Sequence, residues 1–317
     1  MSATSSSRAA GKRPSATRIP AADAEPYGPE GRSPWLDVDW AEHQRWMSVD
    51  GETINTIVLG DGPPVVFVHG LAGSWQNWLE QVPVLAREHR VVTLDLPGFG
   101  SSPLPRGELS IVRYARLLDG LLDQLGIDGA ALVGNSMGGF IAAELAIAFP
   151  QRVERLVLIS AAGISTYGDA RTTRALPVLR RTERIVAASA AWMASRSDAA
   201  ARRPRLREAT LALVVRHPSL LPAPLAAEQM RGAGKPGFLQ ALESIIDYDF
   251  RERLGEIACP TLIVWGEGDR LINVRDADVF AELIPGSRLV IYEDTGHMAM
   301  LERPTAFNAL LREFLAE

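Results

Sequence analysis

A serine framed by glycines is the strongest chemical feature of this sequence. An apolar run at 131–133 leads into Gly-Asn-Ser-Met-Gly at 134–138, and a helix-forming run at 140–149 follows. A strand that turns into a helix within a few residues needs a sharp bend, and the glycines on either side of Ser136 remove side chains that would collide across it. The serine hydroxyl would then stand at a helix start, where free N–H groups stabilise an anion. The segment predicts a serine nucleophile.

A serine hydroxyl becomes a good nucleophile only when a base takes its proton and a third group orients that base. His297 comes just after the last predicted strand, 288–292, and Asp269 comes just after the preceding strand, 261–266. We therefore predict a catalytic triad of Ser136, Asp269 and His297, in that chain order.

Other residues could take the same roles. Glu267 and Asp294 are alternative acids, although Asp294 is so close to His297 in sequence that it would need an unusual loop path. His69, after the strand at 65–68, could act as a second base. A role in bracing its own loop by hydrogen bonds is the favoured interpretation of His69.

The negative charge that forms on the attacked carbonyl needs two backbone donors. The N–H of Met137, directly after the nucleophile, is the first expected donor, and the N–H of Leu71 in the loop at 69–74 is the second. Trp75 follows this loop, and we expect it to line the entrance to the substrate pocket.

Apolar runs that read as buried strands alternate with helical patterns along most of the chain. This alternation predicts an α/β fold with a mostly parallel central sheet and helices on both faces. Chemistry in such sheets gathers beyond the carboxyl ends of the strands, where Ser136, Asp269 and His297 all fall. The expected strands are 44–49, 52–59, 65–68, 91–96, 130–133, 155–160, 261–266 and 288–292.

Four segments are expected. Residues 1–33 are rich in Ser, Ala, Pro and Arg and predict a disordered leader. The hydrolytic core is expected at 34–163 and 251–317. Between them, 164–250 has helical composition without a strand pattern, which predicts an inserted helical cap.

Composition narrows the classes of function. The 317 residues are 47% hydrophobic, with a formal net charge of −5 that disfavours nucleic acid as a partner. The single cysteine, Cys259, excludes an intrachain disulfide, and the five histidines lack metal-ligand spacing. Without a secretory h-region or a membrane-spanning run of ~20 apolar residues, we expect a cytoplasmic protein that needs no metal or cofactor.

The cap is basic, with eleven arginines against four acids between residues 165 and 218. The favoured interpretation of this charge is a solvated helix face. The functional alternative is weak contact with an anionic membrane surface or attraction of an acidic substrate. We expect the apolar side chains of the cap, Trp192 and Met193 among them, to face the triad and bind substrate. The eleven arginines are residues 171, 174, 180, 181, 184, 196, 202, 203, 205, 207 and 216.

Taken together, these motifs resemble those of the α/β-hydrolase superfamily, from about residue 44 to the C-terminus. The resemblance is to the serine esterase and lipase-like branch, and it implies the α/β-hydrolase fold, the triad named above and a structural turn at Asp95. The motifs that carry it are His69-Gly70, Asp-Leu-Pro-Gly-Phe-Gly-Ser at 95–101, Gly-Asn-Ser-Met-Gly-Gly at 134–139, Gly-Glu-Gly-Asp at 266–269 and Gly296-His297.

The resemblance also orders the possible activities. Haloalkane dehalogenases and epoxide hydrolases of this fold carry aspartate where this chain has Ser136, so serine favours acyl transfer from carboxylic esters of small to medium apolar substrates. Carbon–carbon bond hydrolases of aromatic ring-cleavage products are the second possibility, although their oxyanion loop is typically richer in glycine. Perhydrolases generally carry an aromatic residue at the position of Leu71. A weakly catalytic ligand-binding protein of the same fold also stays open.

Overall fold

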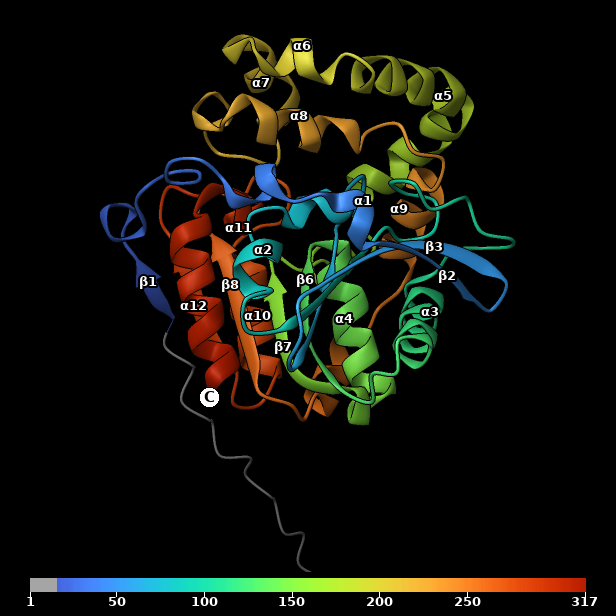
Figure 1. The fold of residues 1–317 in the computed structure, drawn as a ribbon. Coiled ribbons are helices and arrows are strands. Elements are labelled where there is room, and N and C mark those ends of the chain that lie inside the picture. Colours follow the sequence, from blue (N-terminus) through green and yellow to red (C-terminus); the bar gives the residue numbers. More distant parts are fainter. Residues whose placement is uncertain (1–15) are drawn as a thin grey trace, which may run out of the picture.

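The computed structural model describes residues 16–317, apart from the side chains at 183, 184 and 186. The strands of this part form one sheet with the order β1-β9-β8-β7-β6-β4-β5-β3-β2 (Figure 1). Their bounds are β1 Thr17–Ile19, β2 Gln44–Val49, β3 Glu52–Leu59, β4 Pro64–Val68, β5 Arg90–Leu94, β6 Ala130–Asn135, β7 Val153–Ile159, β8 Thr261–Gly266 and β9 Arg288–Tyr292. Neighbours are parallel except where β3 pairs with β2 and β5.

Helices cover both faces of the sheet, as the sequence predicts. One face packs on α3 (Ile111–Gln124), α4 (Met137–Ala148) and α10 (Arg275–Leu283), and the other packs on α2 (Val82–Leu85) and α12 (Pro304–Ala316). Successive strand residues point to opposite faces, so Val66 and Leu132 belong to the first core, whereas Phe67 and Val133 belong to the second. This two-sided burial explains why the central strands are continuous apolar runs.

Helices inserted between β7 and β8 form a cap, drawn above the sheet in Figure 1. They are α5 Ala170–Ala194, α6 Ser197–Ala201, α7 Pro204–Leu211, α8 Ala223–Arg231 and α9 Phe238–Asp247. The predicted fold class, a mostly parallel sheet with helices on both faces and a helical insertion, is confirmed.

Shorter elements connect these layers. Two are α-helical turns, α1 Trp40–His43 and α11 Ala299–Glu302. The others are 3-10 turns: η1 Ala21–Ala24, η2 Pro34–Asp37, η3 Trp75–Trp78, η4 Pro150–Arg152, η5 Pro218–Leu220 and η6 Arg251–Glu256.

The disordered leader expected at 1–33 needs correction. Residues 1–15 lie outside the described residues, but the segment from residue 16 onward packs onto the domain. Strand β1 extends the sheet by pairing in parallel with β9, and Ala24 is fully buried in the core. The sequence hides this strand because three residues are too few to show a period, and its partner is more than 250 residues away.

Candidate active site

The predicted nucleophile stands on a strained turn between β6 and α4. Ser136 has φ 55° and ψ −119°, a backbone conformation that side-chain-bearing residues adopt at a cost. A Cβ on Gly138 would lie 2.1 Å from the Val68 carbonyl oxygen, and one on Gly134 would lie 2.3 Å from the Gly138 carbonyl oxygen. Both positions therefore require glycine. For Gly134 the reason is the predicted collision across the bend, whereas for Gly138 it is the close approach of α4 to the end of β4.

The predicted acid and base form a buried pair. His297 Nδ1 lies 2.7 Å from Asp269 Oδ2, and both side chains are almost completely shielded from solvent. The other carboxylate oxygen of Asp269 accepts the N–H groups of Leu271 and Ile272 at 2.8 and 2.9 Å. A carboxylate acceptor at Nδ1 keeps the proton there, so that Nε2 of His297 is free to accept a proton.

Asn135 joins the histidine loop to the nucleophile turn. Its side-chain amide donates to the His297 carbonyl at 3.2 Å and to the Ile159 carbonyl at 3.1 Å. Ser136 is the next residue, so the loop that bears His297 lies directly against the turn. The structure thus gathers the three predicted triad residues at the carboxyl ends of β6, β8 and β9.

Glu302, which the sequence reasoning missed, holds the loop around His297 in place through hydrogen bonds to its backbone. It is fully buried and accepts the N–H groups of Gly296 at 2.9 Å and Met298 at 3.2 Å, the two neighbours of His297. It also accepts from the backbone of Arg216 and from the hydroxyl of Tyr27 at 2.6 Å. Burial raises the pKa of the Glu302 carboxyl, and these four donors counteract that by stabilising its ionised form. An acidic residue directly after the apolar run at 298–301 is the only signal that the sequence offers for it.

The cap reaches the catalytic loops through the chain after α7. The N–H of His297 donates to the Val214 carbonyl at 3.1 Å, and Arg270, next to the predicted acid Asp269, donates to the Ala212 carbonyl at 3.2 Å. The cap and the acid–base pair are therefore joined by direct hydrogen bonds.

The loop at 69–73 lies against the nucleophile, as an oxyanion hole requires. A Cβ on Gly70 would approach the Ser136 Cβ to 3.0 Å, and Leu71 follows directly. Among the described residues, neither the Leu71 N–H nor the Met137 N–H donates a hydrogen bond to another residue. Both predicted donors are thus available, and the Met137 N–H belongs to the first turn of α4.

His69 braces this loop. Its Nε2 accepts the Leu96 N–H at 2.9 Å, so its Nδ1 carries the proton and donates to the Gly70 carbonyl at 2.7 Å. Complete burial lowers the pKa of His69, which favours the neutral ring that this pattern needs. The bracing role, and not that of a second base, fits both contacts.

The other acids are engaged elsewhere. Asp294 contacts His217 Nε2 at 2.9 Å, and Glu267 pairs with Arg18 at 2.7 Å on the surface. Asp95 accepts hydrogen bonds from the backbone of Trp75 and Ser101, which is the structural turn that the resemblance implies.

The expected substrate-binding residues are placed differently from the prediction. Trp75 is buried in the core against Trp40, with ring centroids 4.8 Å apart. Trp192 and Met193 are 60% and 42% exposed on the outside of the cap. In the C-terminal part of α5, the backbone near Ala187 and Ala191 packs against Gly234 on the opposite side of the helix.

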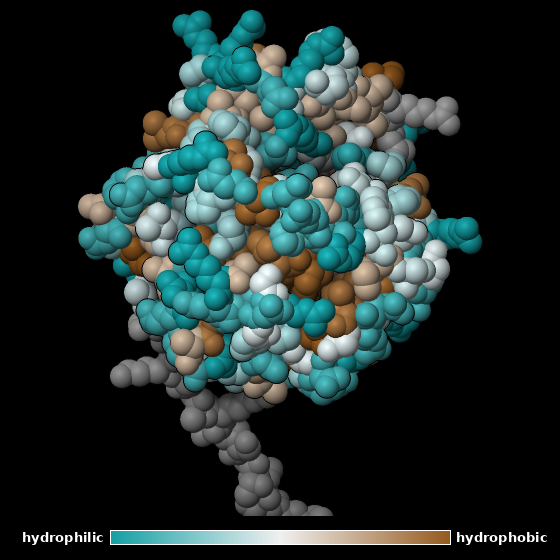
Figure 2. Space-filling model, viewed as in Figure 1, coloured by the Kyte–Doolittle hydropathy of each residue, from teal (hydrophilic) through white to brown (hydrophobic). Residues whose placement is uncertain are grey.

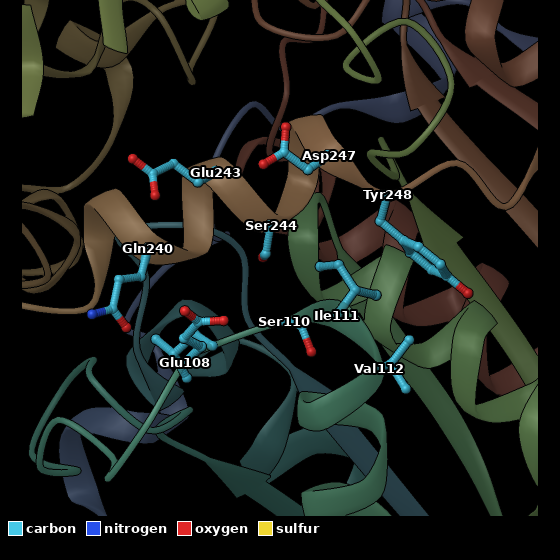
Figure 3. A pocket seen from close by; sticks show the side chains of 10 residues that line it. Glu108, Ser110, Ile111, Val112, Gln240, Glu243, Ser244, Asp247 and Tyr248 are labelled. Carbon is cyan, nitrogen blue, oxygen red and sulfur yellow. The ribbon is translucent and has the colours of Figure 1, made fainter. Parts of the chain in front are cut away.

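The cavity shown in Figure 3 has a volume of about 560 Å³ and lies between α9 and the N-terminal end of α3. Its lining includes three carboxylates, those of Glu108, Glu243 and Asp247, and none of the triad or oxyanion residues. It is therefore separate from the catalytic centre.

Within 16–317, no group of three or more His, Cys, Asp and Glu side chains could hold a metal ion. Among the helices of that part, none is long and apolar enough to cross a membrane.

Comparison with known proteins agrees with this geometry. A family model described as the alpha/beta hydrolase fold matches residues 63–304. The 2-hydroxy-6-oxo-2,4-heptadienoate hydrolase of Pseudomonas putida strain F1 is 31% identical over 290 residues, which is 87% of this chain and 97% of that protein. The 2-hydroxy-6-oxononadienedioate/2-hydroxy-6-oxononatrienedioate hydrolase of Klebsiella pneumoniae is 33% identical over 87% of this chain and 96% of that protein.

Among solved structures, the enol-lactonase from Burkholderia xenovorans LB400 aligns with a TM-score of 0.70 and 26% identity. The alignment covers 86% of this chain and 100% of that one. With the nucleophile turn, the buried acid–base pair and the family match in agreement, the chain belongs to the α/β-hydrolase fold family.

Proposed function

We propose that this protein is a serine hydrolase that cleaves carboxylic esters of small to medium apolar substrates through an acyl-enzyme. The observation that carries the proposal is the buried Asp269–His297 pair, 2.7 Å apart, held against the strained turn of Ser136. This arrangement provides a nucleophile, a base with a free Nε2 and an orienting carboxylate.

In the first half-reaction, His297 Nε2 takes the Ser136 hydroxyl proton while Oγ bonds to the ester carbonyl carbon. The N–H groups of Met137 and Leu71 hold the oxyanion of the tetrahedral intermediate. The intermediate collapses by breaking its bond to the alcohol oxygen, which receives the proton from His297. The products are an alcohol and the Ser136 acyl ester.

In the second half-reaction, water takes the place of the alcohol. His297 accepts a proton from the water as its oxygen attacks the acyl carbon, and the same donors hold the new oxyanion. Collapse breaks the bond to Ser136 Oγ, which recovers the proton. Asp269 keeps the imidazole oriented and stabilises its protonated form in both halves.

The likeness to an enol-lactonase supports this proposal, because a lactone is a cyclic ester. For the location we propose the cytoplasm, for which the single cysteine is the support.

A second candidate function is hydrolysis of a carbon–carbon bond beside a carbonyl. It is favoured by the two relatives that are named as hydrolases of 2-hydroxy-6-oxo dienoates and match over nearly their full length. Those substrates are carboxylates, for which a binding site needs a cationic side chain. Arg216 packs beside Gly268 near the predicted acid and could be such a cation. Its guanidinium already pairs with Asp294 at 3.4 Å, which makes it less suited to bind a substrate carboxylate.

The deciding experiment measures hydrolysis of p-nitrophenyl esters from acetate to long acyl chains, together with a 2-hydroxy-6-oxo dienoate. Wild type should turn over esters with a chain-length optimum and leave the dienoate nearly unchanged. Ser136→Ala should lose the ester activity by a factor of about 10⁴ or more. Ser160→Ala, which alters a buried serine at the end of β7, serves as the matched control.

Each other outcome redirects the assignment. Serine-dependent cleavage of the dienoate with negligible ester turnover would replace the ester proposal by the carbon–carbon one. If wild type exceeds Ser136→Ala on no substrate, the protein is a ligand-binding member of the family, and the hydrolase proposal fails.

A further inference from the structure

The outer face of α5 combines arginines with exposed apolar side chains in a way that packing does not explain. Val178, Ile185 and Trp192 follow one another at intervals of seven residues and are 61%, 70% and 60% exposed. Seven residues are nearly two helical turns, so the three side chains lie along one line of the helix.

Arginines occupy the same line. Arg171 stands seven residues before Val178. Arg174 and Arg181 stand three or four residues from Val178 or Ile185, and all three arginines are exposed. These three arginines with Val178, Ile185 and Trp192 are called the outer face of α5 below. Among the described side chains, Arg174 and Arg181 have no acidic partner within ion-pair distance.

Two arginines elsewhere on the cap pair with acids. Arg180, which falls on another side of α5, pairs with Glu243 at 2.7 Å. Arg231, on α8, pairs with Asp198 at 2.6 Å. Arg202, Arg203 and Arg205, around the start of α7, are exposed as well. The outer face is therefore the part of a wider basic surface of the cap that also carries a line of exposed apolar side chains.

The outer face lies at the outside of the molecule. In Figure 1, α5 forms part of the uppermost layer of the cap, far from the sheet. Figure 2 shows hydrophobic side chains at the upper right of the cap, over α5, among hydrophilic ones. A surface that approached the cap from above would meet this face.

A second copy of the chain is a poor occupant for the outer face. Pairing two identical faces would bring Arg174 and Arg181 of each copy toward those of the other, and such like-charge contacts are unfavourable. An anionic bilayer matches better, because its headgroups attract arginines while the apolar side chains between them enter the boundary with the acyl chains. Trp192, with the guanidinium of Arg196 4.1 Å from its ring centroid, suits the polar–apolar boundary.

We propose that the outer face of α5 docks the protein onto anionic phospholipid surfaces. The net charge of −5 turns the rest of the molecule away from such a surface, so that the cap faces the lipid. Docking is reversible and weakens as salt screens the arginines. It does not depend on the proposed ester chemistry.

The test is cosedimentation of the full chain with vesicles. One set contains phosphatidylcholine alone, and the other contains roughly one phosphatidylglycerol in three lipids. Wild type should bind the second set at low salt, leave the first set unbound and be released by high salt. Arg174→Gln/Arg181→Gln should weaken binding about tenfold or more, because each arginine near an anionic surface contributes appreciably.

The apolar side chains are tested by Val178→Gln/Ile185→Gln, which should also weaken binding while the melting temperature stays at the wild-type value. The matched control is Trp46→Gln/Arg116→Gln, which removes an exposed tryptophan and an exposed arginine outside the cap. This control should bind vesicles as wild type does.

Several results would overturn the proposal. Failure of wild type to bind either set of vesicles is one such result, and binding of both α5 variants as tight as that of wild type is another. Concentration-dependent dimerisation that Val178→Gln/Ile185→Gln abolishes would assign the face to a second copy. Binding to polyglutamate without binding to vesicles would assign it to an acidic polypeptide.

Discussion

At the residue scale, the structure gives two buried histidines opposite tasks through their partners. His297 faces a carboxylate at Nδ1 and keeps Nε2 free, whereas His69 has both ring nitrogens engaged by backbone groups. The first can exchange protons during a reaction, and the second holds a loop in place. The groups that hydrogen-bond to each imidazole therefore decide whether it can exchange protons or only hold the loop.

The triad predicts the effect of replacing the acid. In Asp269→Asn, the amide can donate to His297 Nδ1, which moves the imidazole proton to Nε2 and removes the base. We expect kcat for an ester substrate to fall by about 10⁴-fold, with a far-ultraviolet circular dichroism spectrum like that of wild type.

Glu267→Gln is the matched control, because Glu267 is two residues away and pairs only with Arg18 on the surface. It should keep kcat within about twofold of wild type, since exposed ion pairs contribute little. An equal loss of kcat in both variants would contradict the assignment of Asp269.

His69 predicts a pH dependence of stability. Burial lowers its pKa, so below about pH 6.5 the unfolded chain takes up a proton that the folded chain does not. The free energy of unfolding should therefore fall as pH drops from 7 to 5, and His69→Gln should show a shallower fall. Urea unfolding at each pH measures both slopes, and equal slopes would refute a neutral buried His69.

At the element scale, the geometry of the candidate site depends on how closely α4 approaches the loop after β4. The glycine at 138 removes the side chain that would separate them, and the positive φ of Ser136 turns the chain sharply enough to meet that loop. The end of β6 and the start of α4 therefore act together to place Ser136 against that loop.

We expect Gly138→Ala to disrupt the close approach of α4 to the loop after β4. The new methyl group would lie 2.1 Å from the Val68 oxygen and 2.6 Å from the His69 oxygen, both of which belong to a buried backbone. The free energy of unfolding should fall by more than about 1–3 kcal/mol, and ester activity should be lost.

Gly255→Ala in η6 is the control, because its Cβ would meet only the Leu283 oxygen at 3.7 Å. That variant should change stability by less than about 1 kcal/mol and keep its activity. Denaturant unfolding and ester assays compare the two, and a Gly138→Ala protein of wild-type stability would contradict the close approach.

At the scale of the whole molecule, distant segments meet at the histidine loop. Glu302 binds the N-terminal segment through Tyr27, the cap through Arg216 and the loop through Gly296 and Met298. Beside it, the ring of Tyr27 packs under the guanidinium of Arg303, 4.8 Å away. Three regions of the chain thus share one buried carboxylate.

Tyr27→Phe should therefore affect more than its own segment. Burial and the neighbouring Glu302 raise the pKa of Tyr27, so its hydroxyl stays protonated and donates. Its removal takes one donor from a buried carboxylate and leaves the His217 N–H without its acceptor. We expect a loss of about 1–3 kcal/mol in the free energy of unfolding.

Tyr167→Phe is the matched control, since Tyr167 is exposed. It should unfold at the same denaturant concentration as wild type. Should Tyr27→Phe do likewise, the N-terminal segment contributes nothing to the stability of the histidine loop.

The sequence by itself determined the parallel sheet, the nucleophile turn and the order of the triad. Short stretches of sequence determine these features. Strands buried on both faces are continuous apolar runs, and a strand-to-helix turn needs glycines beside Ser136. Asp269 and His297 could be predicted because strand ends share one edge of the sheet, which makes their position after β8 and β9 informative.

Only the tertiary structure decided which surfaces meet. The pairing of β1 with β9, the contacts of Glu302 and the outward direction of Trp192 depend on partners far away in the chain. A three-residue strand has no period, and an amphipathic helix that carries arginines and apolar residues on one line does not state which line is buried. For α5 the close packing of its backbone near Ala187 and Ala191 against Gly234 settles that choice, and the side with Trp192 is left outside.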